Sequence, residues 1–254
     1  AGVVRGSLQW QARVPTPMTQ PPRAVAVVTV SRSDYGHLFP VLRAIHASPK
    51  LRLSLVVAGA HLSRDFGFTV ETIEGDGWTP AARVEMLEPG DSPEAVAVSM
   101  GRGVTGFARA WAALSPDIVL VLGDRFEMLA AAAAALPFAL PVAHIHGGEL
   151  SEGAMDNQVR HAITKLAHIH FVSAEPHARR VAAMGEEAWR IHTVGAPGLD
   201  RLEALATLSR SELAAALDLP LDDRWLIVTF HPVTLDYAAT ADHVAELLAS
   251  LEGA

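Results

Sequence analysis

The sequence predicts an α/β protein built on a parallel sheet with helices on both faces. From residue 23 onward, short runs of Val, Ile and Leu alternate with Ala-rich stretches of helical periodicity. The apolar runs are continuous, as is typical of strands that are buried on both faces. Half of the 254 residues are hydrophobic and 19% are charged, so the chain can bury a large core.

The expected elements follow one another in a regular order. We expect strands at residues 25–30, 51–58, 118–122, 141–145, 169–173 and 191–194. Helical spacing of apolar residues predicts helices around 38–45, 68–74, 95–114, 126–136 and 156–167. Asp156 is interpreted as a possible cap of the last of these helices, and its polar residues, including Arg160, as a solvent-facing stripe.

The character of the chain changes near residue 199. A charged helical stretch at 200–217 precedes one more expected strand at 225–230 and a helix at 242–251. One strand and one helix cannot close a second sheet. They therefore either pack on the edge of the first sheet or belong to a longer protein of which this chain is a fragment. We expect a proline-rich tail without stable contacts at 1–22, a parallel-sheet domain at 23–199, and a linker helix with the start of a truncated second domain at 200–254.

Composition excludes several classes of protein. The chain has 20 Lys and Arg against 28 Asp and Glu, a net charge of −8, which disfavours a nucleic-acid binder. It has no Cys, so disulfides, thiolate metal sites and cysteine nucleophiles are excluded. The longest uncharged apolar run, at 128–143, is shorter than the roughly 18–20 residues of a membrane span. We expect a cytoplasmic protein that does not enter a membrane.

Polar residues with glycines follow five of the expected strands. They are S-R-S-D-Y-G at 31–36, G-A-H-L-S at 59–63, G-D-R at 123–125, H-G-G-E at 146–149 and H-P at 231–232. In an open parallel sheet, ligands bind outside the carboxyl ends of the strands. Aspartate is common at the start of a helix, which can explain the presence of Asp34 or Asp124 after a strand. It does not explain why Arg32, Arg125 and His231 also follow strands.

The motifs that are missing narrow the choice of ligand. No G-x-G-x-x-G follows the first strand, and the chain has neither a Walker A motif nor a G-x-S-x-G elbow. Arg32 and Arg125 at strand ends, without a Walker lysine, suit a diphosphate that is held by bidentate arginines and helix N-termini.

His144 and His146 allow a different interpretation. A spacing of two residues places both rings on one face of a strand, where they could hold a divalent metal ion together with Asp124. A metal-dependent hydrolase is therefore one alternative.

At these residues the sequence resembles the hydrolysing UDP-N-acetylglucosamine 2-epimerases of bacterial sialic-acid and related nonulosonic-acid pathways. The matching segments cover about 24–254. They are S-R-S-D-Y-G (31–36), H-L-S-R-D-F-G-F-T (61–69), G-D-R-F-E-M-L-A-A-A (123–132), H-I-H-G-G-E (144–149), D-N-Q-V-R-H-A-I-T-K (156–165), V-G-A-P-G-L-D (194–200) and T-F-H-P-V-T-L-D (229–236).

The resemblance implies a Rossmann-like, glycosyltransferase-B-like architecture of two domains, with the second domain largely missing from this chain. It implies anti elimination of UDP across C1 and C2 of UDP-N-acetylglucosamine to a 2-acetamidoglucal. Hydration then yields N-acetylmannosamine, and neither a metal ion nor another cofactor is needed. It further implies a nucleotide-sugar substrate, and we expect a homo-oligomer. The same chemistry on UDP- or GDP-linked amino sugars of legionaminic-type pathways is a further alternative. Another is a nucleotide-sugar binder without catalytic activity, in which Asp124 and Asp156 would be dispensable.

Site residues are carried over position by position. Arg32, Arg125 and His231 resemble the nucleotide-contacting residues of the family, and Asp124 and Asp156 resemble its essential acids. Glu149 is a further catalytic candidate. His146 is also a candidate, because it stands where more distant epimerases have a Glu. Two departures are that Ser33 replaces the usual small Ala and that Asn157 replaces a second acid.

Overall fold

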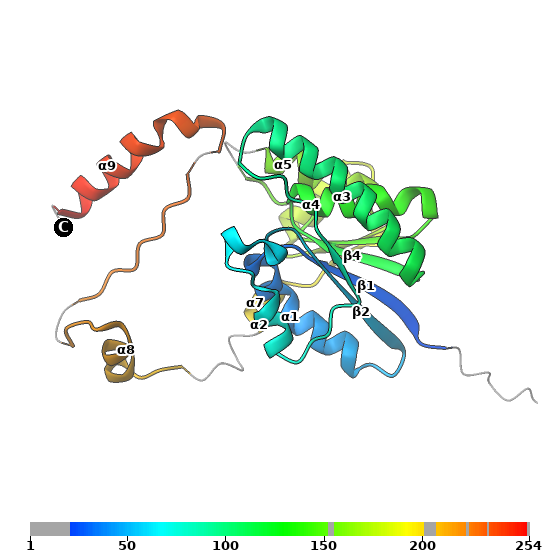
Figure 1. The fold of residues 1–254 in the computed structure, drawn as a ribbon, viewed down its shortest axis with the longest axis horizontal. Coiled ribbons are helices and arrows are strands. Elements are labelled where there is room, and N and C mark those ends of the chain that lie inside the picture. Colours follow the sequence, from blue (N-terminus) through cyan, green and yellow to red (C-terminus); the bar gives the residue numbers. More distant parts are fainter. Residues whose placement is uncertain (1–20, 152–154, 201–206, 222–223, 233, 253–254) are drawn as a thin grey trace, which may run out of the picture.

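The computed structural model describes residues 21–151, 155–200, 207–221, 224–232 and 234–252 (Figure 1). Residues 1–20 of the expected tail therefore lie outside the described residues. In the described part, no helix is both long and apolar enough to cross a lipid bilayer. The division at 23–199 and 200–254 stays a prediction.

Seven parallel strands form one sheet, in the order β3-β2-β1-β4-β5-β6-β7. This confirms the predicted parallel α/β fold. The order reverses between β1 and β4, which pair directly, for example Val27 with Leu120. The strands are β1 (Arg23–Thr29), β2 (Leu51–Ala58), β3 (Ala82–Val84), β4 (Ile118–Leu122), β5 (Val142–Ile145), β6 (Ile169–Val172) and β7 (Ile191–Thr193).

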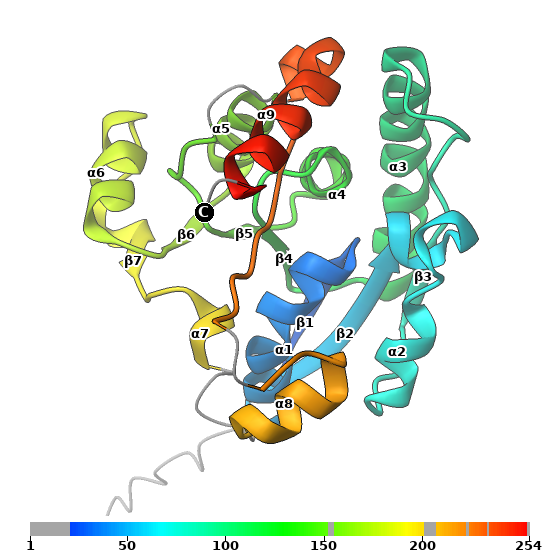
Figure 2. The same cartoon turned by 90° about the vertical axis from the view of Figure 1, so that its left-hand side faces the viewer.

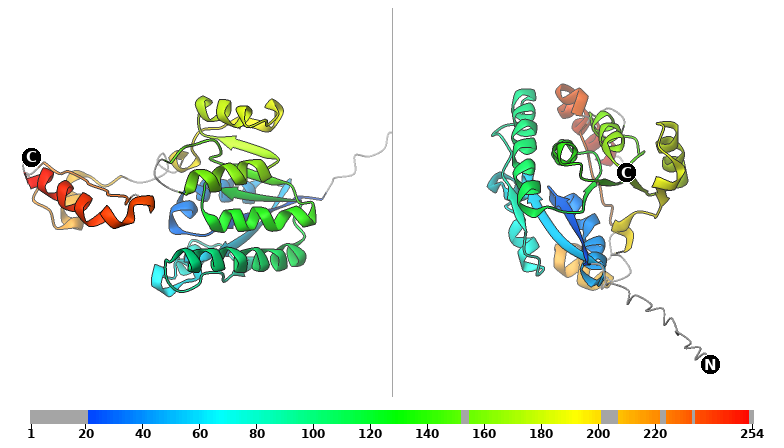
Figure 3. Two further views of the ribbon diagram at one scale, coloured as in Figure 1. Left: turned by 90° about the horizontal axis from the view of Figure 1, so that it is seen from above. Right: turned by 90° about the vertical axis from the view of Figure 1, so that its right-hand side faces the viewer.

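Helices cover both faces of the sheet, as Figures 2 and 3 show. Buried side chains of α3, α4 and α5 pack on one face, and those of α1 and α2 pack on the other. The α-helices are α1 (Arg32–Ala47), α2 (Val70–Gly75), α3 (Pro93–Leu114), α4 (Phe126–Ala135), α5 (Asp156–Leu166), α6 (Glu175–Ala183), α7 (Pro197–Asp200), α8 (Arg210–Leu217) and α9 (Thr240–Glu252).

Small residues let α3 and α4 pack closely. The buried face of α4 is a run of alanines, and α3 contributes Gly103 opposite it. A Cβ atom on Gly103 would lie 2.5 Å from Met86 Cε and 3.0 Å from Ala130 Cβ. The close packing anchors α4, whose first turn follows the carboxyl end of β4.

The C-terminal part corrects two expectations. Residues 225–230 form no strand, and Ile227 is 94% exposed. A strand needs a neighbour for its backbone hydrogen bonds, and no described strand pairs with this segment. Within the charged stretch at 200–217, α7 ends at Asp200, residues 207–209 form no helix and α8 spans Arg210–Leu217, while residues 201–206 lie outside the described residues. Figure 1 shows the part from α8 to α9 set apart from the sheet.

Candidate active site

Two adjoining cavities open where the strand order reverses, at the carboxyl ends of β1 and β4. This is the position at which open α/β sheets bind ligands. The smaller cavity, of about 270 Å³, and the larger one, of about 1270 Å³, share Ser33 and Arg125. The smaller cavity is lined by Ser33, Asp34, His37, Leu122, Gly123, Asp124, Arg125, His146, Glu149 and Arg160.

Asp34 anchors the loop after β1. Its Oδ2 accepts hydrogen bonds from Thr29 Oγ1 at 2.6 Å and from the Val30 backbone N–H at 2.8 Å. The Ser31 hydroxyl donates to Oδ1. With all of these bonds in a buried position, Asp34 has a structural role that holds the start of α1, and thus Ser33 and His37, against the cavity.

The turn after β4 places Asp124 and Arg125. It begins at Gly123, whose φ of 78° is favourable for glycine and costly for other residues. Arg125 then donates from Nη2 to Glu127 Oε1 at 2.8 Å and from Nε to Oε2 at 3.2 Å. Burial would lower the pKa of Arg125, but the carboxylates of Glu127, Asp34 and Asp124 outweigh it and raise the pKa.

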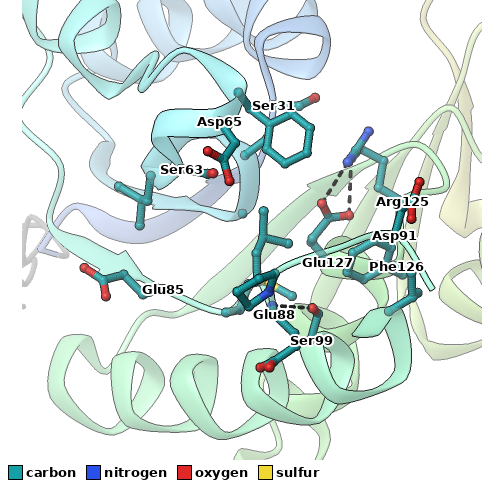
Figure 4. A pocket seen from close by; sticks show the side chains of 18 of the residues that line it. Ser31, Ser63, Asp65, Glu85, Glu88, Asp91, Ser99, Arg125, Phe126 and Glu127 are labelled. Atoms are coloured by element: carbon teal, nitrogen blue, oxygen red, sulfur yellow. Dashed lines mark hydrogen bonds and ion pairs between the residues drawn. The ribbon is translucent and has the colours of Figure 1, made fainter. Parts of the chain in front are cut away.

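The larger cavity has a strongly acidic lining (Figure 4). Asp65, Glu85 and Asp91 face it, and Arg125 is held by Glu127 at its border with the smaller cavity. Arg32 also lines it and is exposed. Phosphate groups are therefore favoured near the arginines and disfavoured beside the carboxylates.

Arg160 is the residue that sequence reasoning missed. Instead of facing solvent, it is buried on α5. Its Nη2 donates to Asp124 Oδ2 and, at 3.1 Å, to Ser151 Oγ, and its Nη1 lies 3.6 Å from Glu149 Oε2. One guanidinium thus joins two of the predicted acids. The helical pattern could not reveal this, because the partners Asp124 and Glu149 lie on other elements of the fold.

Asp156 is the first residue of α5 and not its cap. The N-cap position is Met155, and no side chain caps this helix, so the predicted capping role is wrong. Burial raises the pKa of Asp156, and the negative charge of Asp124 raises it further, against the charges of Arg160 and Arg125. The two acids therefore interact electrostatically and differ in environment, because Asp124 is paired with Arg160.

His144 and His146 do not have the geometry that the metal interpretation requires, so this interpretation is wrong. Strand β5 ends at Ile145, and His146 has a φ of 65°, so the two rings do not share a strand face. His144 is buried, with Nε2 2.7 Å from Gly123 O and Nδ1 3.2 Å from Thr164 Oγ1. Burial lowers its pKa to about 3, so the ring is neutral and supports the Gly123 turn.

Within the described residues, no group of three or more His, Asp or Glu side chains is arranged to hold a metal ion.

Glu149, which lines the smaller cavity, is the centre of a hydrogen-bond cluster. Its Oε1 lies 2.6 Å from His146 Nδ1 and accepts from Ser173 Oγ at 2.5 Å. Burial alone would raise the pKa of Glu149. The hydrogen bonds from His146 and Ser173, with the charges of His146 and Arg160, instead lower it to about 2. Glu149 is therefore a carboxylate at neutral pH.

The structure brings most of the predicted site residues together, with two exceptions. Asp156 lines neither cavity, although it lies close enough to Asp124 to interact with it electrostatically. Asp124, Arg125, His146 and Glu149 line the smaller cavity, while Arg32 lines the adjoining one. His231 lines neither cavity and is exposed on the segment between α8 and α9.

These features define an α/β protein with a polar, charge-paired ligand cleft at the switch point of a parallel sheet. Comparison with known proteins places the chain within that class. The family model described as UDP-N-acetylglucosamine 2-epimerase matches residues 43–254, and the chain belongs to this family.

Three curated relatives are 33–39% identical to this chain over the aligned residues. It is 39% identical over 211 residues to a UDP-N,N'-diacetylbacillosamine 2-epimerase (hydrolyzing) of Legionella pneumophila, covering 83% of this chain and 56% of the relative. It is 33% identical to a GDP/UDP-N,N'-diacetylbacillosamine 2-epimerase (hydrolyzing) of Campylobacter jejuni and 34% identical to a UDP-N-acetylglucosamine 2-epimerase of Neisseria meningitidis. Each of these two matches covers 91% of this chain and 60% of the relative.

Solved structures share the fold at lower identity. The UDP-GlcNAc 2-epimerase of Neisseria meningitidis bound to UDP-GlcNAc matches with a TM-score of 0.64 at 17% identity, over 76% of this chain and 50% of that one. The enzyme of Methanocaldococcus jannaschii in complex with UDP-GlcNAc and UDP matches with a TM-score of 0.62 at 19% identity, over 71% and 50%. The chain thus spans about half to three fifths of the length of the proteins it matches.

Proposed function

We propose that this chain belongs to a hydrolysing 2-epimerase, which releases UDP from UDP-N-acetylglucosamine and adds water to give N-acetylmannosamine. The observation that carries the proposal is Asp124, which lines the smaller cavity beside Arg125, with Asp156 at the start of α5 close enough to interact with it electrostatically. Two acids in different environments suit a reaction that removes a proton on one face of a carbon and delivers one on the other.

The elimination step requires a base at C2 of the sugar. As a carboxylate takes the C2 proton, the C2–H electron pair forms the C1=C2 bond and the C1–O pair leaves with UDP. Hydration then reverses the flow of electrons: water oxygen bonds to C1, and C2 receives a proton on the opposite face. Asp124, held as an ion pair by Arg160, suits the accepting role. Asp156, with its raised pKa, suits the donating role.

The leaving diphosphate requires positive charge and hydrogen-bond donors. Arg125 keeps Nη1 outside its two hydrogen bonds to Glu127, so that nitrogen can meet a phosphate oxygen at the cavity border. Arg32 on the adjoining cavity is the second candidate for this contact. We assign His231 to the nucleotide as well, on the resemblance of its motif alone.

A second substrate class is favoured by the curated relatives. Two of them, at 33% and 39% identity, are named for N,N'-diacetylbacillosamine, linked to UDP or to GDP or UDP. The chemistry at C1 and C2 is the same for these diacetamido sugars. Turnover of UDP-N-acetylglucosamine, of UDP-diacetamido sugar and of GDP-diacetamido sugar, followed by NMR, separates the candidates.

Asparagine substitutions test the two acids. Asp124→Asn and Asp156→Asn should each lower kcat by roughly 10²–10⁴-fold in a folded protein, as expected for the loss of general acid–base help. Asp218→Asn is the matched control, since Asp218 lines neither cavity and has a left-handed backbone that asparagine tolerates. A folded Asp156→Asn protein with the rate of this control would remove Asp156 from the mechanism.

Heavy water tests the elimination itself. The released sugar should carry deuterium at C2, because the proton at C2 is lost and regained through the unsaturated intermediate. Product without solvent deuterium at C2 would refute elimination. A protein that binds UDP with unchanged affinity in both asparagine variants, and turns over none of the sugars, would instead be a non-catalytic binder.

A further inference from the structure

We propose that Glu149 is a positioning residue and that it works with Ser173 and His177 to present Nε2 of His146 as the base for the attacking water. The proposal rests on the proposed function, whose two carboxylates act at C2. Ser173 and His177 lie at the end of β6 and on α6, outside both cavities.

The hydrogen bonds of the cluster specify where each proton lies. The Ser173 hydroxyl has a single proton, which it donates to Glu149 Oε1 at 2.5 Å. Ser173 Oγ must therefore accept from His177 Nδ1, 2.9 Å away. Because the Glu149 carboxylate only accepts, His146 Nδ1, at 2.6 Å from Oε1, must carry a proton and donate it.

This arrangement leaves Nε2 as the exchangeable nitrogen of His146. The atom is buried and has no hydrogen-bond partner within the described structure, although the ring lines the smaller cavity. An unpaired buried nitrogen is costly unless a ligand or water meets it. The ring of His37 packs edge-on against that of His146, with centroids 5.8 Å apart, and limits its rotation.

The backbone around the cluster is also held rigidly. His146 has a left-handed φ of 65°, an uncommon conformation that persists only where neighbours enforce it. A Cβ atom on Gly148 would lie 2.5 Å from His177 O, so α6 packs directly on the Gly147–Gly148 turn. Arg180, also on α6, donates to Gly148 O. Helix α6 thus supports the catalytic turn through both side chain and backbone.

The proton balance of the step is complete. As a water oxygen bonds to C1 of the unsaturated sugar, the C1=C2 electron pair takes a proton at C2 from the carboxylic acid. The water proton passes to His146 Nε2, and the resulting imidazolium is stabilised by the Glu149 carboxylate at Nδ1. The imidazolium then returns its proton to solvent.

Nitrogen-15 NMR of the histidine rings tests the tautomer directly. In the wild-type protein, the neutral ring of His146 should carry its proton on Nδ1, and its signal is assigned by its loss in His146→Gln. A proton on Nε2 instead would overturn the proposal, whatever the variants do.

Partial reactions test the role in hydration. Ser173→Ala and Glu149→Ala should slow formation of the epimerised sugar by roughly tenfold or more, as expected for loss of a hydrogen bond to a charged group. KM and the rate of UDP release should change less, so the unsaturated sugar should accumulate. Ser54→Ala, a buried serine on β2 outside the cluster, is the control and should accumulate none.

Two outcomes separate the proposals. If wild-type protein releases no UDP from any of the sugars, the proposed function fails. If it does, but Ser173→Ala and Glu149→Ala match the control in both rate and accumulated intermediate, the positioning role fails. Glu149→Gln keeps an acceptor oxygen for His146, so it provides a folded comparison if Glu149→Ala is unstable, and it should lose less activity.

Discussion

Charge pairing determines what each ionisable residue of the cleft can do. Arg160 binds both Asp124 and Glu149, and it does so from a buried position on α5. The hydrogen bonds from His146 and Ser173, together with Arg160, keep the pKa of Glu149 low, whereas burial and then the charge of Asp124 raise the pKa of Asp156. Three acids that look equivalent in the sequence are therefore different in chemistry.

Arg125→Lys keeps the positive charge of residue 125 but replaces the planar guanidinium, so it tests whether UDP binding needs the guanidinium itself. Arg125→Lys loses the two parallel hydrogen bonds to Glu127 and the guanidinium that can meet phosphate. We expect UDP binding to weaken by about 1–3 kcal/mol, measured by titration calorimetry. Arg32→Lys should act in the same direction. The control Arg83→Lys changes an exposed ion pair with Glu74 and should leave the affinity for UDP unchanged. If both Arg125→Lys and Arg32→Lys keep wild-type affinity, the nucleotide binds elsewhere.

At the scale of elements, the contact between α3 and α4 can be tested with two glycines of one helix. Gly101→Ala meets no atom within 4 Å, so it should raise the free energy of unfolding by about 0.4–1 kcal/mol, because alanine restricts the unfolded chain. Gly103→Ala places its methyl against Met86 and Ala130, and should lower the free energy of unfolding by about 1–3 kcal/mol. Urea denaturation measures both. Equal effects of the two substitutions would contradict the close packing.

Elements with a strong pattern were predictable from the sequence, and short or isolated ones were not. The expected strands at 51–58 and 118–122 coincide with β2 and β4. Strand β3 has only three residues, and helix α6 buries a single side chain, Val181, so neither shows the run of apolar residues that marks the other elements. The apolar run at 225–230 has the composition of a strand, yet it forms none because a strand exists only with a paired neighbour.

At the scale of the whole molecule, buried histidines make stability depend on pH. Burial lowers the pKa of His144 to about 3, and it also lowers the pKa of His61 and His170. Between about pH 6.5 and 3, the unfolded chain binds a proton at His144 that the folded chain does not. The free energy of unfolding should therefore fall as the pH is lowered through this window.

The contribution of His144 can be isolated by substitution. His144→Gln keeps a donor for Gly123 O and removes the titration. The slope of unfolding free energy against pH between 6 and 4 should decrease by up to about 1.4 kcal/mol per pH unit, the value for one proton. Urea denaturation at several pH values measures it. His192→Gln, an exposed histidine on β7, should keep the wild-type slope. An unchanged slope in His144→Gln would mean that His144 is not buried as a neutral ring.

The sequence by itself determined the parallel α/β fold, the edge of the sheet that carries the cleft, and the family. Those features are local: apolar runs, helical spacing, and polar motifs directly after strands. Only the tertiary structure decided that Arg160 turns inward, that His144 is structural, and that Glu149 binds His146 and Ser173. Burial and charge pairing depend on neighbours far along the chain, as with Arg160 and Asp124, which are 36 positions apart. No local pattern in the sequence contains that information.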